Sequence, residues 1–166
     1  MNASEKYISL YKKMASLCQR NGWGDPFSYA RSKEIYATCV LNHKMPGASD
    51  YSGADAINEE GDGVEYKSTI APKVKGSYTG ISVQETWDEQ VKYLREHKIL
   101  KYPEHYFNRF QDGELVESWV LTGQQVYDIL LPKLEKKFDT VLSKKDPRLS
   151  AEVTNRDIIN NGRKVI

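Results

Sequence analysis

A short pattern of acidic and basic residues in the first half of the chain has the chemistry of a metal site. In the segment 64–68, Val-Glu-Tyr-Lys-Ser, a strand would send Glu65 and Lys67 to the same face. Asp55 precedes them across a Gly-Asp-Gly turn, and an even register would place it on that face, opposite Lys67 and diagonal to Glu65. Side chains at such positions stand about 4.5–8 Å apart. Two carboxylates and a lysine would then share one surface.

Carboxylates without a nearby histidine or cysteine form an oxygen-only site, which suits Mg²⁺, with Mn²⁺ as the expected substitute. Magnesium takes its remaining ligands from water and phosphate, so the expected substrate carries phosphate. The ion would polarise a phosphodiester and activate a water, while Lys67 would orient that water or stabilise the developing charge. Two neighbouring carboxylates favour the charged form of Lys67, so the general base stays unassigned. The alternative interpretation is an ordinary solvated acidic turn.

Two helices are expected before this hairpin. Apolar residues at helical spacing, followed by Asn21-Gly22 as a stop, predict an amphipathic helix over 4–20. Asp25-Pro26 predicts the start of a second helix, which runs, broken or unbroken, to Leu41. Met45-Pro46-Gly47 would end it.

Two further helices are expected after the hairpin. A capping-box pattern over 82–85 predicts a helix that stops before Pro103. A second such pattern over 122–125 opens a last amphipathic helix, which Pro132 would kink or divide. Residues 73–79 between these elements are expected to be a polar loop.

Turn residues and alternating apolar residues predict two hairpins, 54–59 with 64–70 and 102–110 with 114–121. The order of elements predicts an α/β (α+β) fold, in which a mixed β-sheet is flanked by helices. The length of 166 residues favours a single domain over 1–166.

Composition limits the partners that can be expected. Lys and Arg number 24 and Asp and Glu number 23, so any affinity for DNA must come from local patches. One such patch is the last part of the chain, where nine basic residues face five acidic ones from Lys133 to Lys164. Cys18 and Cys39 have no zinc-site spacing and are expected to be buried thiols in a reducing compartment. No stretch approaches the roughly 20 apolar residues of a membrane span, so a cytoplasmic protein is expected.

The segments 53–57, Gly-Ala-Asp-Ala-Ile, and 65–68, Glu-Tyr-Lys-Ser, together resemble the active-site hairpin of the PD-(D/E)xK nuclease superfamily. In spacing and flanks they look closest to the PvuII-type restriction endonucleases. Weaker similarity of pattern covers most of the chain, including 21–27, 45–47, 106–138 and 161–166. The resemblance implies a restriction-endonuclease-like fold.

By this resemblance Asp55 and Glu65 bind the metals, the backbone carbonyl of Tyr66 completes a site, and Lys67 is the catalytic lysine. The family acts as homodimers that cut both strands of palindromic DNA, and the first helix is then the expected contact between subunits. Residues 1–50 would be a helical part that dimerises and embraces DNA. Residues 51–131 would be the catalytic core and 132–166 a basic C-terminal part.

The chain departs from this pattern in its expected DNA-reading residues. It lacks the histidine cluster that follows the catalytic strand in the PvuII type, and it has Tyr29 near the place of an acidic residue expected after Phe27. The residues expected to contact bases and phosphates in place of that cluster are Lys73, Lys75, Ser77, Tyr78 and Thr79. An ordinary solvated loop is the other interpretation. The recognition sequence therefore stays open.

The expected function is that of a type II restriction endonuclease, which hydrolyses double-stranded DNA at a specific, palindromic site with magnesium. The alternatives are a junction-resolving or repair nuclease of the same fold, and a DNA-binding module that does not cleave. Carboxylates that face phosphate argue against the binding module. The histidines His43, His97 and His105 are expected to be structural or surface residues. The tryptophans Trp23, Trp87 and Trp119 are expected to be core residues rather than stacking platforms.

Overall fold

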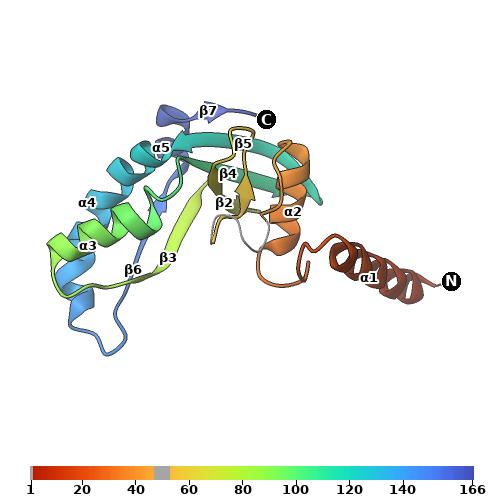
Figure 1. Cartoon of the computed structure of the whole chain (residues 1–166), viewed down its shortest axis with the longest axis horizontal. Coiled ribbons are helices and arrows are strands. Elements are labelled where there is room, and N and C mark those ends of the chain that lie inside the picture. Colours follow the sequence, from red (N-terminus) through yellow and green to blue (C-terminus); the bar gives the residue numbers. More distant parts are fainter. Residues whose placement is uncertain (1, 47–52) are drawn as a thin grey trace.

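The computed structural model describes residues 2–46 and 53–166 (Figure 1). The helices are α1 (Ala3–Arg20), α2 (Arg31–Val40), α3 (Trp87–Tyr93), the π-helical turn η1 (Leu94–Lys98), α4 (Gly123–Leu142) and α5 (Asn155–Asn161). The strands are β1 (Ala56–Ile57), β2 (Gly63–Thr69), β3 (Gly76–Ser82), β4 (Glu104–Gln111), β5 (Glu114–Thr122), β6 (Arg148–Val153) and β7 (Arg163–Lys164).

The central sheet is mixed and has the strand order β1-β2-β4-β5-β7. Strands β2 and β4 are parallel, and the other neighbours are antiparallel. A separate two-stranded sheet joins β3 to β6. A mixed sheet accompanied by helices confirms the expected fold class.

Apolar side chains pack on both faces of the central sheet. On one face, Phe107 and Leu121 of the sheet pack with Leu130 and Leu134 of α4 and with Leu149 of β6. On the other face a smaller cluster contains Ala37 of α2 together with Val64, Tyr66, Tyr106 and Phe110. Residues of β2 alternate between the faces, so Glu65 and Lys67 point away from the cluster that holds Val64 and Tyr66.

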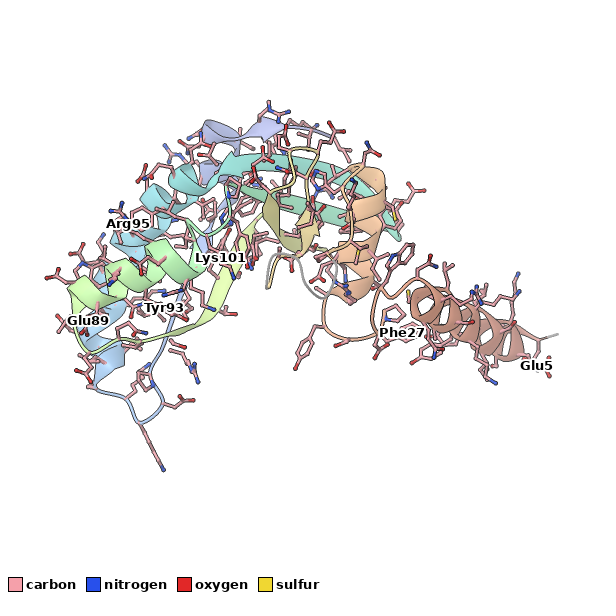
Figure 2. All side chains as sticks on the ribbon, viewed as in Figure 1. Glu5, Phe27, Glu89, Tyr93, Arg95 and Lys101 are labelled. Atoms are coloured by element: carbon pink, nitrogen blue, oxygen red, sulfur yellow. The ribbon has the colours of Figure 1, made fainter. Side chains whose placement is uncertain are left out.

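Helix α1 extends away from the rest of the molecule (Figure 1), and it confirms the helix expected over 4–20. Asn2 and Glu5 form a capping box at its start. Phe27, labelled in Figure 2, lies at the base of the helix, where its ring stacks on Tyr11 with the centroids 3.7 Å apart. The apolar stripe of α1 is open to solvent, since the exposed fractions are 53% for Ile8 and 54% for Leu10.

Helix α2 starts at Arg31, later than expected. The carboxylate of Asp25 accepts a hydrogen bond from the amide of Phe27 (3.0 Å) and so caps a turn. Tyr29 has φ at +45°, a left-handed conformation that interrupts any helix between them. Of the expected end at Met45-Pro46-Gly47, the glycine lies outside the described residues.

Two further expectations about the elements are wrong. Residues 76–82 form β3, so the polar loop expected over 73–79 ends at Lys75. The capping box of α3 consists of Thr86 and Glu89, four residues after the pattern expected over 82–85. Of the two effects expected from Pro132, division of the helix does not occur, because α4 continues through it with Leu130 and Leu134 packed in the core.

The hairpin of β4 with β5 and the capping box of Thr122 with Gln125 are confirmed. Cys18 is buried as expected, but Cys39 is exposed, because it lies on the side of α2 that lines an open groove. Among residues 2–46 and 53–166, no helix combines the length and the apolar character that crossing a membrane requires.

Candidate active site

The hairpin of β1 and β2 positions Asp55 beside Glu65. Ala56 pairs with Val64 and Ile57 with Gly63, so the turn between the strands covers residues 58–62. Within it, Asn58 Oδ1 accepts a hydrogen bond from the amide of Asp62 (2.8 Å). The turn is therefore placed earlier than the sequence suggested, and Asp55 lies next to Glu65 and Tyr66 instead of opposite Lys67.

Two hydrogen bonds to the backbone of β2 hold Asp55 in this position, one from its own amide and one to its carboxylate. Its amide donates to the carbonyl of Val64 (3.0 Å), and its Oδ2 accepts from the amide of Tyr66 (2.8 Å). Both partners belong to β2, the strand that carries Glu65 and Lys67. The position of the Asp55 carboxylate is therefore coupled to that strand.

Asp55, Glu65 and Lys67 line one cavity of about 450 Å³. The three side chains thus meet at one site, as the sequence predicted. The other walls come from β3, η1, β4 and the segment between η1 and β4, with Ser77, Tyr78, Thr79, Lys98, Lys101, Tyr102 and His105 among them. The cavity lies on the face of β2 opposite the cluster of Val64 and Tyr66.

Lys67 has two contacts inside this cavity. Its Nζ donates a hydrogen bond to Glu65 Oε1 at 2.5 Å, and it lies 4.7 Å from the centre of the Tyr78 ring. The side chains of Lys67 and Glu65 are only 22% and 19% exposed. A cation is therefore held between a carboxylate and an aromatic face in a partly desolvated site.

Burial and the negative charge of Glu65 raise the pKa of Asp55 to about 7, against the opposing hydrogen bond from the amide of Tyr66. Two carboxylates that repel each other in a cavity form a natural cation site, because a bound cation would remove that repulsion. The donor set of Asp55, Glu65 and the Tyr66 carbonyl consists of oxygen atoms alone. It fits Mg²⁺, which needs only one or two carboxylates and keeps several waters.

No group of three or more His, Cys, Asp or Glu side chains able to bind a metal occurs within the described ranges.

The residues expected to read DNA divide into two groups. Lys73 and Thr79 are exposed, and Lys75 and Ser77 are exposed but both lie within 3.3 Å of Glu152 Oε2. Tyr78 is buried, and its hydroxyl is 2.8 Å from Nδ1 of His105. Since β3 is a strand, alternate residues point to opposite sides, and Tyr78 faces the interior.

The sequence reasoning missed Lys98, Lys101, Tyr102 and His105 as members of the site. The parallel pairing of β2 with β4 sets His105 next to Glu65, and this pairing has no local sequence signal. Lys101, labelled in Figure 2, follows the helical segment of α3 and η1, which was expected only as a helix before Pro103.

The remaining histidines occupy structural or surface positions, as expected, whereas the expected core position of the tryptophans holds for Trp87 and Trp119 but not for Trp23. His43 Nδ1 lies 2.6 Å from the hydroxyl of Tyr66, whereas the side chain of His97 is 64% exposed. Trp87 and Trp119 are partly buried against the larger core. Trp23 lines a groove beside α1.

Comparison with models of known protein families gave no match, and comparison with curated proteins gave no significant match.

Proposed function

We propose that this chain is a magnesium-dependent DNA endonuclease of the PD-(D/E)xK superfamily with a restriction-endonuclease-like fold. The observation that carries the proposal is the meeting of Asp55, Glu65 and Lys67 in one cavity. The raised pKa of Asp55 supports it, because two carboxylates that resist joint ionisation favour a divalent cation. The mixed sheet with apolar clusters on both faces is compatible with the fold.

The roles of the residues follow from their chemistry. Asp55, Glu65 and the carbonyl of Tyr66 would hold Mg²⁺, which when bound supplies a Lewis acid for the phosphodiester and its attacking water. Lys67 holds a positive charge in the same cavity, where it would stabilise the charge that develops on the phosphate. The amide of Tyr66 keeps Asp55 oriented. Lys98 and Lys101 on the cavity wall would contact the DNA backbone.

The proposed substrate is double-stranded DNA with a palindromic site, as for a type II restriction endonuclease. Ser77 and Thr79 are exposed residues of β3 that line the cavity, and Lys73 and Lys75 are exposed in the segment before β3. These side chains are the proposed contacts to bases and phosphates. The two unpaired thiols, Cys18 and Cys39, suit the cytoplasm, which we propose as the site of action.

A palindrome requires two active sites related by two-fold symmetry, so we propose a homodimer. The exposed apolar stripe of α1 is the proposed contact. It continues into an apolar groove of about 790 Å³, bounded by α1, α2 and the turn between β4 and β5. Pairing of two copies along this surface would cover Met14, Leu17 and Val40, which are about half exposed in the single chain.

The test is digestion of plasmid and genomic DNA in Mg²⁺ by the wild-type protein and by Asp55→Asn. Discrete fragments from the wild type, and none from the variant, are expected. Cleavage confined to branched DNA would instead identify a junction-resolving nuclease. Equal cleavage by both proteins would place the active site elsewhere, and binding without cleavage by the wild type would indicate a DNA-binding module.

A further inference from the structure

We propose that Tyr78 and His105 are positioning residues that hold Lys67 in its working place. The ammonium group of Lys67 lies over the face of the Tyr78 ring, and a hydrogen bond with His105 fixes the position of that ring. The inference rests on the proposed function in one respect, namely that Lys67 takes part in DNA cleavage. It assigns Tyr78 a role inside the active site, in place of the contact to DNA that its sequence position suggested.

The first step of the argument is the orientation of His105. Its Nε2 lies 2.9 Å from the carbonyl oxygen of Ile99, and its Nδ1 lies 2.8 Å from the hydroxyl of Tyr78. A carbonyl oxygen only accepts, so Nε2 carries the proton. In the neutral ring Nδ1 then accepts from the Tyr78 hydroxyl. Burial lowers the pKa of His105, which favours this neutral form.

The second step is the fixed position of the Tyr78 ring. His105 is fully buried and Tyr78 is 8% exposed, so close packing restricts the movement of both side chains. The backbone of Ile99 therefore fixes His105, and His105 fixes the phenol ring. These contacts hold the aromatic face of Tyr78 in a fixed position inside the cavity.

The third step is the contact between the ring and Lys67. The Nζ atom of Lys67 lies 4.7 Å from the ring centre, within the distance at which an aromatic face attracts a cation. Lysine has a flexible stem and no preferred geometry of its own, so its charge must be located by its surroundings. Glu65 and Tyr78 provide two such contacts. If Glu65 takes up a cation, the ring contact remains.

The close approach of β3 to β2 supports this contact. A Cβ atom on Gly76 would overlap the Phe107 ring and would stand 3.0 Å from Cβ of Lys67. Only a residue without a side chain therefore lets β3 cross here. Tyr78 lies two residues further along β3 and points to the same side as Gly76, toward Lys67.

The experiment compares Tyr78→Phe, which keeps the aromatic face, with Tyr78→Leu, which removes it. Tyr127→Leu is the matched control, since Tyr127 is buried in the same core cluster and does not line the cavity. The readouts are the single-turnover cleavage rate at saturating DNA in Mg²⁺ and the DNA dissociation constant in Ca²⁺.

We expect Tyr78→Leu to lower the cleavage rate by about 10²-fold, the typical effect of a misplaced catalytic group, while its DNA affinity stays near that of the wild type. Tyr78→Phe should cleave faster than Tyr78→Leu but more slowly than wild type, because it keeps the aromatic face and loses the hydrogen bond with His105. Tyr127→Leu should cleave at nearly the wild-type rate. An undiminished rate in Tyr78→Leu, or equal losses in Tyr78→Phe and Tyr78→Leu, would overturn the proposal.

An NMR measurement tests the contact without relying on cleavage. Protons on Cε of a lysine above an aromatic ring are shifted upfield by the ring current. The shifted signal should be assigned to Lys67 by its loss in Lys67→Ala, should persist in Tyr78→Phe and should vanish in Tyr78→Leu. Absence of such a signal in the wild type refutes the positioning role even if Tyr78→Leu does not fold. A wild type that shows the signal but cuts no DNA would refute the proposed function instead.

Discussion

The backbone amide of Tyr66 donates a hydrogen bond of 2.8 Å to Oδ2 of Asp55. Tyr66 separates Glu65 from Lys67 on β2, so the residue between two of the proposed functional side chains also orients the third. The bond comes from the main chain and does not depend on the tyrosine side chain. The geometry of the two carboxylates is therefore set by the pairing of β1 with β2.

The buried carboxylate of Asp55 should make metal-free stability depend on pH. Its pKa is raised from 3.8 to about 7, so its contribution to stability is full below 3.8 and is lost as the pH rises through about 7. Asp55→Asn should therefore raise the melting temperature in chelator at pH 8, and the gain should shrink toward pH 4. The gain is at most about 4 kcal/mol, since one pKa unit is worth about 1.4 kcal/mol.

Thermal unfolding in chelator and in Mg²⁺ checks this expectation. Wild type should gain stability from Mg²⁺ at pH 8, whereas Asp55→Asn should gain little, because it has lost one proposed ligand. If Asp55→Asn is less stable than wild type at pH 8 without metal, the carboxylates of Asp55 and Glu65 do not repel each other as inferred.

Cleavage should require a divalent cation that fits an oxygen-only site. We expect activity with Mg²⁺ or Mn²⁺, and we expect Ca²⁺ to support DNA binding with little cutting. The measurement is a plasmid cleavage assay in each metal beside a binding titration. Undiminished cleavage in chelator would refute the metal mechanism.

Asp55 and Lys67 carry opposite charges, so replacing each of them should change DNA binding in opposite directions while lowering cleavage in both cases. Asp55→Ala and Lys67→Ala should both lower cleavage by at least about 10²-fold, since each removes a group that stabilises the reacting charges. In chelator, Asp55→Ala should bind DNA as tightly as wild type or more tightly, because a negative charge is lost. Lys67→Ala should bind somewhat more weakly. A filter-binding or anisotropy titration in chelator measures both, and wild-type cleavage by both variants would contradict the site.

The lysines of the segment before β3 should contribute unequally to DNA binding. Lys75 is engaged by Glu152 at 3.1 Å, which offsets part of its charge, whereas Lys73 is exposed in the loop. Lys73→Ala should therefore weaken binding more than Lys75→Ala, by roughly 1–3 kcal/mol if a base contact is lost. Binding titrations in Ca²⁺ give the two values. If both variants bind DNA as tightly as wild type, this segment does not contact DNA.

The apolar stripe of α1 should hold two copies together. Ile8→Asp and Leu10→Asp should shift the protein toward monomer, because both side chains are more than half exposed in the single chain. Tyr11 is a poorer site for this test than its exposure suggests, since it also stacks on Phe27. Sedimentation velocity at micromolar concentration is the measurement, with Lys13→Ala as the surface control. A wild-type monomer that still makes double-strand breaks would argue against the dimer.

Local signals predicted much of this fold. Capping residues, turn residues and apolar spacing are signals that span only a few neighbouring residues. They predicted helix α1, the two hairpins and the start of α4. The exact register of β1 with β2 did not follow, because it depends on how Asn58 closes the turn. The meeting of Asp55, Glu65 and Lys67 survived that error, since a shift of two positions keeps the side chains on one face.

The parts of the site that escaped prediction depend on pairings between distant segments. His105 lies beside Glu65 only because β2 and β4 are parallel neighbours, and Tyr78 turns inward only because β3 pairs with β6. Neither pairing leaves a periodic pattern in the sequence. The polar segment 73–79 therefore suggested a loop, although four of its seven residues belong to β3.

The pairing of β3 with β6 also bears on the order in which the proposed site can form during synthesis. Strand β6 is the sheet partner of β3, which carries Tyr78, and it follows β3 far along the sequence. A nascent chain that has not yet reached β6 lacks that partner, so the cavity wall that contacts Lys67 would be incomplete. Under the proposed function, the nascent polypeptide would therefore have no complete cleavage centre before β6 is synthesised.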